Sequence, residues 1–213
     1  MKVVTKRAGT TKEQIEAEEP EVSPGVARRL RRRETVYLAA IELFTERGYE
    51  ATSMEDIAER ADVSRGSVFN YFQYKLAFLE EWGERRRSEA VAALRQSEVA
   101  DPSVRTYLQG YMRAMAQVST NSRAETVSLM GAASQAMNLF DDPPMARDLR
   151  EFFRHALDSG KLSPEVDPDR AALLISTSYT ATLVRWLRVE PPFDLAAELL
   201  AVLDLLLRGL EAP

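Results

Sequence analysis

The segment TSMEDIAERADVSRGSVFNYFQYK, from Thr52 to Lys75, constrains the fold of this chain more than any other. Apolar residues recur in it with helical spacing, first at Met54, Ile57, Ala58 and Ala61 and again at Val68, Phe69 and Phe72. Only Asp62 and Val63 break the period between the two runs. Thr52 with Glu55, and then Ser64, supply the oxygen atoms that open helices. Two short helices joined by so tight a turn predict a helix-turn-helix unit over residues 53–72.

The second helix of this unit is expected to enter a major groove of DNA. Its apolar residues face the core, so its remaining residues are left for DNA. Arg65 has the reach to bind O6 and N7 of guanine, and Asn70 suits adenine or a phosphate. Thr52 and Lys75, at the ends of the unit, are better placed for phosphates than for bases. The predicted DNA contacts are Thr52, Ser64, Arg65, Gly66, Ser67, Asn70, Tyr71 and Lys75.

A third helical pattern precedes the unit. In RRRETVYLAAIELFTERGYEATS, apolar residues follow helical spacing up to Gly48, which suits a left-handed position after a helix. The stretch AAIELFTERGYEATSMEDIAERADVSRGSVFNYFQYK closely resembles the amino-terminal domain of the TetR family of transcriptional regulators. One difference is Asp62, which replaces the usual glycine of the turn. Because Asp tolerates the left-handed conformation better than most residues, we expect the turn to be intact.

Composition excludes several kinds of catalytic and metal site. The chain has no Cys and one His, His155, so disulfides, thiol nucleophiles and thiolate metal sites are ruled out, and a His-based triad has little to build from. Paired carboxylates remain open as a catalytic possibility. We expect neither an enzyme nor a bound cofactor or metal. No apolar run is long enough to span a membrane and no signal peptide is visible, so we expect a cytoplasmic protein.

The net charge of −5 is distributed unevenly along the chain. Residues 88–213 hold 12 Lys and Arg against 17 Asp and Glu, which places the acidic surplus away from the helix-turn-helix. Five arginines, Arg28, Arg29, Arg31, Arg32 and Arg33, stand before the first predicted helix. They are either a solvated charge run or an arm that tracks DNA phosphates or enters the minor groove. Glu80, Glu81 and Arg85–Arg87 are expected to form a solvated helix face.

Helical patterns dominate the remainder, and they predict an all-α protein of about nine helices. Residues 1–27 are polar and predict a flexible tail. Residues 30–90 form the expected DNA-binding domain, and residues 91–213 a larger helical domain. Helices are expected from Leu76 to about Val99, from Asp101-Pro102 to about Val118, from Arg123 to Met137, after an acidic cap at Asp141-Asp142, from Asp167-Pro168 to Arg188, and from Asp194 to Leu210.

The last two predicted helices are candidates for a dimer interface. The final helix carries an apolar stripe from Leu195 to Leu210, and the helix before it alternates bulky and small residues. In the resembling family, the last two helices pair with those of a second subunit. Both helices can also pack only within their own subunit. The resemblance implies a homodimer.

A concentration of Met and aromatic residues marks a candidate ligand pocket. Met side chains are adaptable and suit a cavity that repacks around apolar ligands, although Met at helical spacing also fills ordinary cores. The resemblance implies an effector pocket in this part of the chain, for a small and hydrophobic or aromatic molecule. The predicted lining is Tyr107, Tyr111, Met112, Met115, Met130, Met137, Tyr179 and Trp186.

The resemblance implies a homodimeric, ligand-responsive repressor that binds a near-palindromic double-stranded operator. Effector binding would shift the helix that begins near Leu76 and thereby change the separation of the two recognition helices. A transcriptional activator, a regulator that responds to a protein partner, and a helical small-molecule sensor or enzyme without DNA binding are the alternatives. The operator, the effector and the regulated genes stay open.

Overall fold

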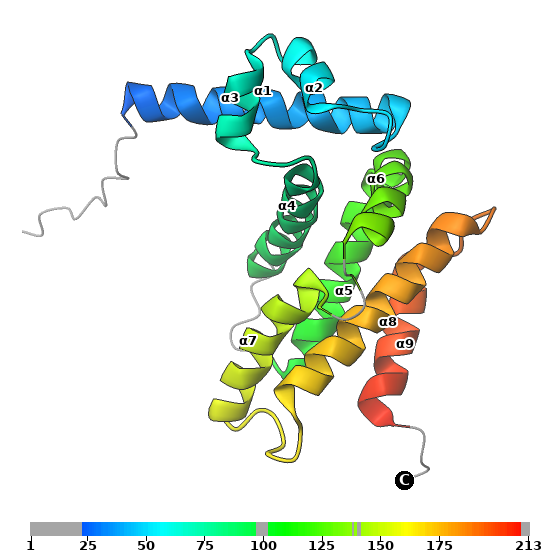
Figure 1. The fold of residues 1–213 in the computed structure, drawn as a ribbon. Coiled ribbons are helices and arrows are strands. Elements are labelled where there is room, and N and C mark those ends of the chain that lie inside the picture. The colour runs from blue at the N-terminus through cyan, green and yellow to red at the C-terminus, as the bar shows by residue number, and fades with distance from the viewer. Residues whose placement is uncertain (1–22, 97–101, 138, 140–141, 210–213) are drawn as a thin grey trace, which may run out of the picture.

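The computed structural model describes residues 23–96, 102–137, 139 and 142–209, which fold into nine α-helices with no β-strand among them (Figure 1). The helices are α1 (Pro24–Arg47), α2 (Met54–Arg60), α3 (Arg65–Tyr71), α4 (Leu76–Arg95), α5 (Val104–Asn121), α6 (Arg123–Ala136), α7 (Pro144–Asp158), α8 (Pro168–Arg188) and α9 (Leu195–Arg208). The predicted all-α class is confirmed. Within the described ranges, no helix is long and apolar enough to cross a membrane.

The first three helices share one small core. Val36 and Phe44 of α1, Ile57 of α2 and Val68 of α3 are each fully buried in it. Aromatic rings extend this core into α4, because the ring of Phe72 stacks on Phe78 with centroids 4.0 Å apart. Burial of such side chains contributes roughly 1.5–3 kcal/mol each. The start of α4 is therefore anchored to the helix-turn-helix.

Helices α4 to α9 form a larger helical body below the amino-terminal unit (Figure 1). Helix α5 packs against α4 and α9, and α7 packs against α8. The fully buried side chains of this body include Leu108, Leu129 and Leu149. The body meets α1 through both α4 and α6, and Ser128 of α6 donates a hydrogen bond to the carbonyl of Phe44 at 3.0 Å.

Helix α2 begins one residue later than its predicted cap. Ser53 is the N-cap, and its hydroxyl oxygen accepts from the Asp56 amide at 3.1 Å while the Asp56 carboxylate accepts from the Ser53 amide at 2.8 Å. The predicted pair of Thr52 with Glu55 is wrong. The Thr52 hydroxyl turns inward instead and donates to the carbonyl of Gly48 at 2.9 Å.

The other helix starts follow the sequence closely. Ser64 caps α3 and Asp167 caps α8, both as predicted. Helix α5 begins after Ser103, whose oxygen accepts from the Thr106 amide, rather than at Asp101-Pro102. The N-cap of α7 is Pro143, which has no side-chain cap, so the predicted acidic cap is wrong for Asp142, and Asp141 lies outside the described residues.

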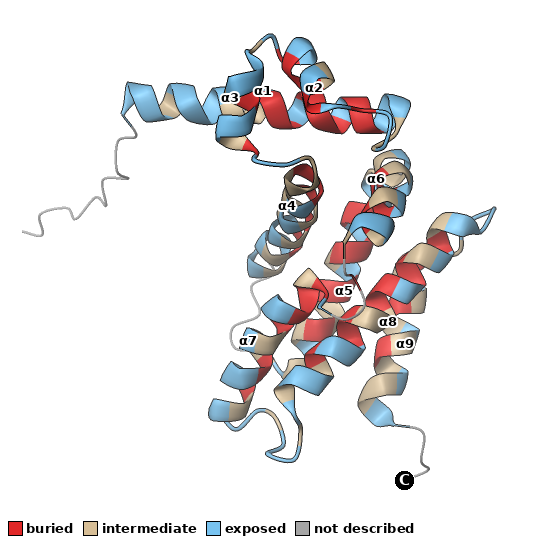
Figure 2. Cartoon of the chain, in the orientation of Figure 1, coloured by how far each residue is buried: buried red, intermediate tan, exposed pale blue. Residues whose placement is uncertain are grey.

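Helix α1 is longer than expected at its amino-terminal end. It begins at Pro24, so residues 24–27 belong to a helix rather than to the predicted tail, whose residues 1–22 lie outside the described ranges. The five arginines consequently lie on α1 and not before it. Figure 2 shows the two halves of this helix to be different, one exposed and the other buried against α2 and α3.

Candidate nucleic-acid interface and ligand cavity

The turn between α2 and α3 depends on Asp62. Its φ is +52°, the only positive φ among the described residues other than glycine, and this confirms the expected left-handed conformation. The backbone then reverses, and the Val63 amide donates to the carbonyl of Ala58 at 3.0 Å. Ser64 follows as the cap of α3. Caps and turn together fix the angle at which α3 leaves α2.

Helix α3 presents a narrow polar face to solvent. Its inner side is held by Val68 and by Phe72, which follows the last turn, and both are buried. The opposite side holds five of the predicted contact residues, of which Arg65, Gly66 and Asn70 are exposed and Ser67 and Tyr71 are half-buried. Such a face can offer a guanidinium, an amide and hydroxyls to a DNA groove, and Gly66 leaves room for the DNA to approach closely.

Phe69 and Arg65 form a local arrangement that sequence periodicity misses. Phe69 was expected in the core, but it is 37% exposed, because its position on α3 faces away from α1 and α2. The Arg65 guanidinium lies over its ring at 5.5 Å and also pairs with Glu55 at 2.8 Å. An exposed pair of this kind contributes roughly 0–1 kcal/mol. DNA can therefore displace Glu55 from Arg65 at small cost.

Thr52 and Lys75 do not present free side chains for phosphate contact. Thr52 is 2% exposed, and its hydroxyl is bonded within the α1–α2 connection. The Lys75 ammonium donates to the carbonyls of Tyr49 and Thr52 at 2.8 and 3.1 Å. Both residues therefore act within the fold, where they tie the start of α4 to the α1–α2 connection. Burial of the Thr52 side chain therefore argues against its predicted phosphate contact.

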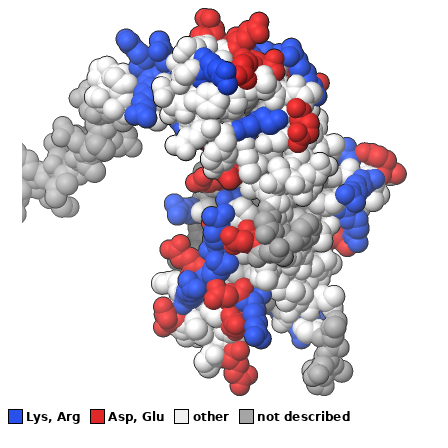
Figure 3. All heavy atoms as spheres, viewed as in Figure 1, with Lys and Arg blue, Asp and Glu red and all other residues white. Residues whose placement is uncertain are grey.

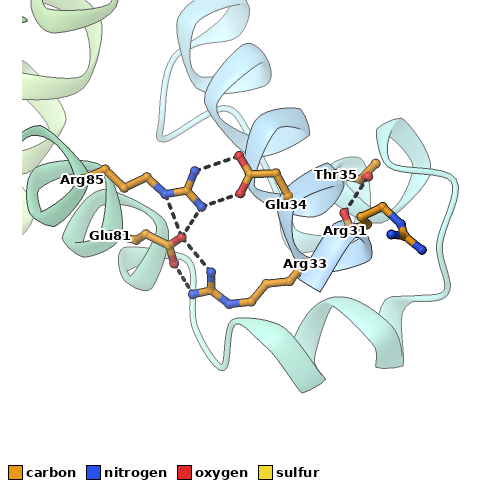
Figure 4. A network of polar contacts seen from close by, with 6 residues as sticks. All are labelled: Arg31, Arg33, Glu34, Thr35, Glu81 and Arg85. Carbon is orange, nitrogen blue, oxygen red and sulfur yellow. Dashed lines mark hydrogen bonds and ion pairs between the residues drawn. The ribbon is translucent and has the colours of Figure 1, made fainter. Parts of the chain in front are cut away.

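An ion-pair network joins α1 to α4 (Figure 4). Arg33 of α1 binds the Glu81 carboxylate, and Arg85 of α4 binds Glu34 through two hydrogen bonds of 2.8 and 2.6 Å. Arg85 also pairs with Glu81 one turn earlier on its own helix. The Arg85 guanidinium holds the pKa of Glu34 below its usual value. These paired charges fix the orientation of α4 relative to the DNA-binding unit.

The other sides of α4 face the helical body. Arg86 is buried, and it donates to the hydroxyls of Ser119 and Ser122 at 3.0 and 2.8 Å. Trp82 donates its indole N–H to Glu125 at 2.5 Å. The expectation of a solvated face is therefore wrong for Arg86, which α4 turns toward the helical body, whereas Arg85 and Arg87 are partly exposed and Arg85 forms an i,i+4 pair with Glu81.

Next to α4 lies an apolar cavity of about 80 Å³. It is smaller than the roughly 300–1,000 Å³ of typical ligand pockets. Its walls come from α4, α5, α6, the α6–α7 connection, α7 and α8. The lining residues are Leu79, Trp82, Gly83, Arg86, Arg87, Met115, Met130, Ala133, Met137, Leu139, Pro143, Pro144, Met145, Tyr179, Thr180 and Leu183.

A charged groove of about 890 Å³ runs between α4 and α7 and shares Arg87, Met137 and Pro144 with the cavity. The two spaces therefore adjoin at these residues. An ion pair crosses the groove there, because Arg87 meets Asp148 of α7 at 2.6 Å. Arg95 and Arg147 add two further positive charges to the groove, and Glu80 and Glu84 add two negative ones. Apolar walls followed by a charged mouth suit an amphiphilic molecule.

Comparison with known proteins identifies the class of this molecule. Residues 37–82 match the model of the bacterial regulatory proteins of the tetR family. The transcriptional repressor KstR of Rhodococcus jostii (strain RHA1) is 30% identical over 83% of this chain and 82% of its own length. The chain belongs to the TetR family.

Two further relatives extend this result. The transcriptional repressor BepR of Brucella suis biovar 1 (strain 1330) is 25% identical over 85% of this TetR-family chain and 92% of its own length. Among solved structures, Thermus thermophilus FadR, a TetR-family repressor in complex with lauroyl-CoA, is 27% identical. It matches with a TM-score of 0.65 over 85% of this chain and 96% of that chain. Membership confirms the prediction of a helix-turn-helix transcriptional regulator, and these relatives are regulators rather than enzymes.

The structure brings half of the predicted ligand residues of this TetR-family chain to one cavity. Met115, Met130, Met137 and Tyr179 line it. The other four lie outside its lining. Tyr107 stacks on Phe152 with centroids 4.0 Å apart, Tyr111 and Met112 are buried in α5, and Trp186 bonds the carbonyl of Phe193 near the start of α9.

Sequence reasoning also missed residues that line this space. Arg86, Arg87 and Leu79 come from α4, which was assigned only to the exit from the DNA-binding domain. Their spacing along α4 was visible in the sequence, but the segments that would face them were not. Pro143 and Pro144, which follow the predicted cap at Asp141-Asp142, were likewise not predicted to line a cavity.

Proposed function

We propose that this TetR-family chain is a ligand-responsive repressor that binds its operator as a homodimer. The observation that carries the proposal is the position of α4. Trp82 and Arg86 face the cavity and the body, while Glu81 and Arg85, on the same turns, hold α1 by ion pairs. One rigid helix therefore contacts both the site for a ligand and the unit that meets DNA.

DNA recognition in this proposal belongs to the polar face of α3. The helix has seven residues, so one copy reaches few base pairs. A two-fold pair doubles the contact and calls for a near-palindromic operator with half-sites about one helical turn or more apart. Arg65 and Asn70 are the residues best suited to base edges, while Tyr71, Ser67 and Ser64 suit phosphates.

Exposed apolar and small residues on α8 and α9 support the dimer. Leu205 and Leu174 are each 52% exposed, which is unusual for leucines in adjacent helices. On α9, exposed Ala197 and Ala201 precede Leu205 at intervals of four and form one stripe. The inner stripe of α9, Leu195 to Leu203, packs within the same subunit. The outer stripe is thus left for a partner copy.

We propose an acyl-CoA, or a molecule with a similarly apolar chain and anionic head, as the ligand class. The apolar cavity suits the chain, and Arg95 and Arg147 suit phosphates in the adjoining groove, which also holds Glu80, Glu84 and the Arg87–Asp148 pair. Lauroyl-CoA binding by the FadR relative adds support. A polar mouth was not part of the sequence prediction, which pointed to a hydrophobic or aromatic molecule alone.

The small cavity volume suggests how the ligand would act. A twelve-carbon chain does not fit into about 80 Å³, so lining side chains must move when it binds. Arg87 and Leu79 belong to α4, and their displacement moves the helix whose ion pairs hold α1. The ligand then favours a conformation of the dimer with lower operator affinity.

The test uses DNA from upstream of the protein's own gene. The chain should bind this fragment tightly with a strong salt dependence, and lauroyl-CoA should weaken the binding at concentrations that leave free CoA without effect. Failure to bind the fragment with any sequence preference would exclude the repressor function. Binding that lauroyl-CoA and longer acyl-CoAs leave unchanged would exclude the ligand class while preserving the DNA-binding function.

A further inference from the structure

The amino-terminal half of α1 is a helix without a core. From Pro24 to Thr35 no residue is buried, whereas from Val36 onward most residues are. Val26 and Leu30 are 50% and 56% exposed. Short helices are marginal in water without packing, because most helical stability in proteins comes from a buried face. Apart from Arg33 and Glu34, which bind α4 through ion pairs, this stretch therefore extends from the folded unit without a buried face.

The stretch also concentrates free positive charge. Arg28, Arg29, Arg31 and Arg32 are exposed, and none forms an ion pair with a described residue. No Asp or Glu occurs from Ser23 to Arg33. Figure 3 shows basic side chains gathered over this part of α1, and in Figure 4 the Arg31 side chain points away from the α1–α4 network.

Most other cations of the DNA-binding unit are already engaged. Arg33 pairs with Glu81, and Arg60 pairs with Glu42 and Glu46. Arg65 pairs with Glu55, and the Lys75 ammonium is held by backbone carbonyls. The helix-turn-helix alone thus offers little uncompensated positive charge to a polyanion. The surplus lies on the first turns of α1.

The arrangement is unfavourable for the isolated helix. The amino-terminal end of an α-helix carries a partial positive charge, which disfavours nearby cations. Helix α1 has no acidic residue in its first turn, and the side chain of Ser23 makes no capping hydrogen bond. A bound polyanion would compensate both the arginines and the helix dipole.

We propose that the stretch Pro24–Arg32 is a second DNA-contacting surface, which binds backbone phosphates of the operator beyond the groove that α3 occupies. The proposal rests on the operator binding described above. Arg28 and Arg32 are four residues apart and share one helix face with Arg31. Figure 1 shows this end of α1 on the side of the molecule away from α8 and α9. In a dimer formed through those helices, the stretch reaches the outer flanks of the operator.

The experiment compares Arg28→Gln/Arg32→Gln with the unaltered dimer on an operator that includes its flanks. Gln removes charge but keeps helix propensity. Two arginines from each of two subunits should lower the slope of log affinity against log salt by about two to four, and affinity at physiological salt by about tenfold or more. The melting temperature of the free protein should stay constant or rise, which a structural role would not allow. Arg28→Lys/Arg32→Lys should restore the salt slope.

Controls separate this surface from other effects. Arg113→Gln/Arg170→Gln removes the same charge from exposed positions of α5 and α8 and should leave the salt slope unchanged. On an operator trimmed to the half-sites, the difference between the variant and the unaltered protein should disappear. An unchanged slope and affinity in Arg28→Gln/Arg32→Gln would overturn the inference while the helix-turn-helix still binds. Loss of binding to anionic vesicles with intact operator binding would reassign the surface to membranes and overturn it as well. Absence of operator binding by the unaltered protein would instead remove its premise.

Discussion

The DNA-binding unit and the ligand cavity differ in how much of their binding geometry is present before a partner binds. The turn at Asp62, the caps at Ser53 and Ser64, and the buried Val68 hold α3 in position without any partner. The cavity, by contrast, has about 80 Å³ and is lined largely by flexible or apolar side chains. The surface of α3 that we propose for DNA is therefore preorganised, while the proposed ligand site must expand to hold an acyl chain. In this proposal, expansion beside α4 connects the two.

The largest expected effect tests the preorganised side of this comparison. Arg65→Ala/Asn70→Ala should reduce operator affinity by about two orders of magnitude, since each base contact is worth roughly 1–3 kcal/mol. Both side chains are exposed, so the melting temperature should change little. Titration of labelled operator measures the affinity, with Arg113→Ala as the control. Unchanged affinity would exclude this face of α3 as the reading surface.

The same substitution placed in the two regions should give opposite results. Ala58→Leu overpacks a buried position of α2 and should destabilise the protein by about 1–3 kcal/mol. Ala133→Leu instead fills part of the cavity and should leave stability nearly unchanged while weakening the response to lauroyl-CoA about tenfold or more. Chemical denaturation and operator release measure the two effects. Equal destabilisation at both sites would contradict the proposed difference in packing.

The next effect concerns the network between α1 and α4. Glu81→Gln removes the carboxylate that Arg33 and Arg85 share. The coupling between ligand and operator should fall by about 0.5–2 kcal/mol, while affinity for lauroyl-CoA without DNA stays close to that of the unaltered protein. Operator titrations with and without ligand measure the coupling. Glu89→Gln, exposed on α4 and outside the network, serves as the control. Identical coupling in both variants would exclude the network as the connection.

The smallest effect is a pH dependence of the same network. Because Arg85 lowers the pKa of Glu34 from the usual 4.5, the charged carboxylate stabilises the folded state above that pH. The stabilisation is lost as the pH falls through the lower value of the folded state. Glu34→Gln should therefore lower the melting temperature at pH 7, and the difference should shrink as the pH falls below 4.5. A difference that is the same at pH 7 and below pH 4.5 would show that Glu34 acts through packing instead.

The two regions also differ in how well the sequence predicts them. The helix-turn-helix depends on contacts between residues close in the sequence. The sequence therefore predicts its helical period, the cap at Ser64 and the conformation of Asp62. Its errors were local, such as Thr52 in place of Ser53. The cavity joins segments far apart in the chain, and the pair Arg87–Asp148 spans 61 residues. Periodicity identified Met115 and Met130 as apolar positions, but it carries no information on which helices meet.

The sequence also shows where the arginines of α1 lie but not which of them have partners. Arg33 binds Glu81, which is 48 residues away in the sequence, whereas the arginines from Arg28 to Arg32 are free, and only the fold reveals this difference. A charge pattern alone does not show which members have partners.

In the proposed mechanism, a ligand in the cavity moves the DNA-binding units of the dimer through α4. Because the chain has no cysteine, Glu59→Cys on the exposed side of α2 gives one spin label per subunit and one distance per dimer. Double electron–electron resonance should show a shift of this distance when lauroyl-CoA binds, and Ala133→Leu should suppress the shift. An unchanged distance at ligand concentrations that release the operator would contradict the account.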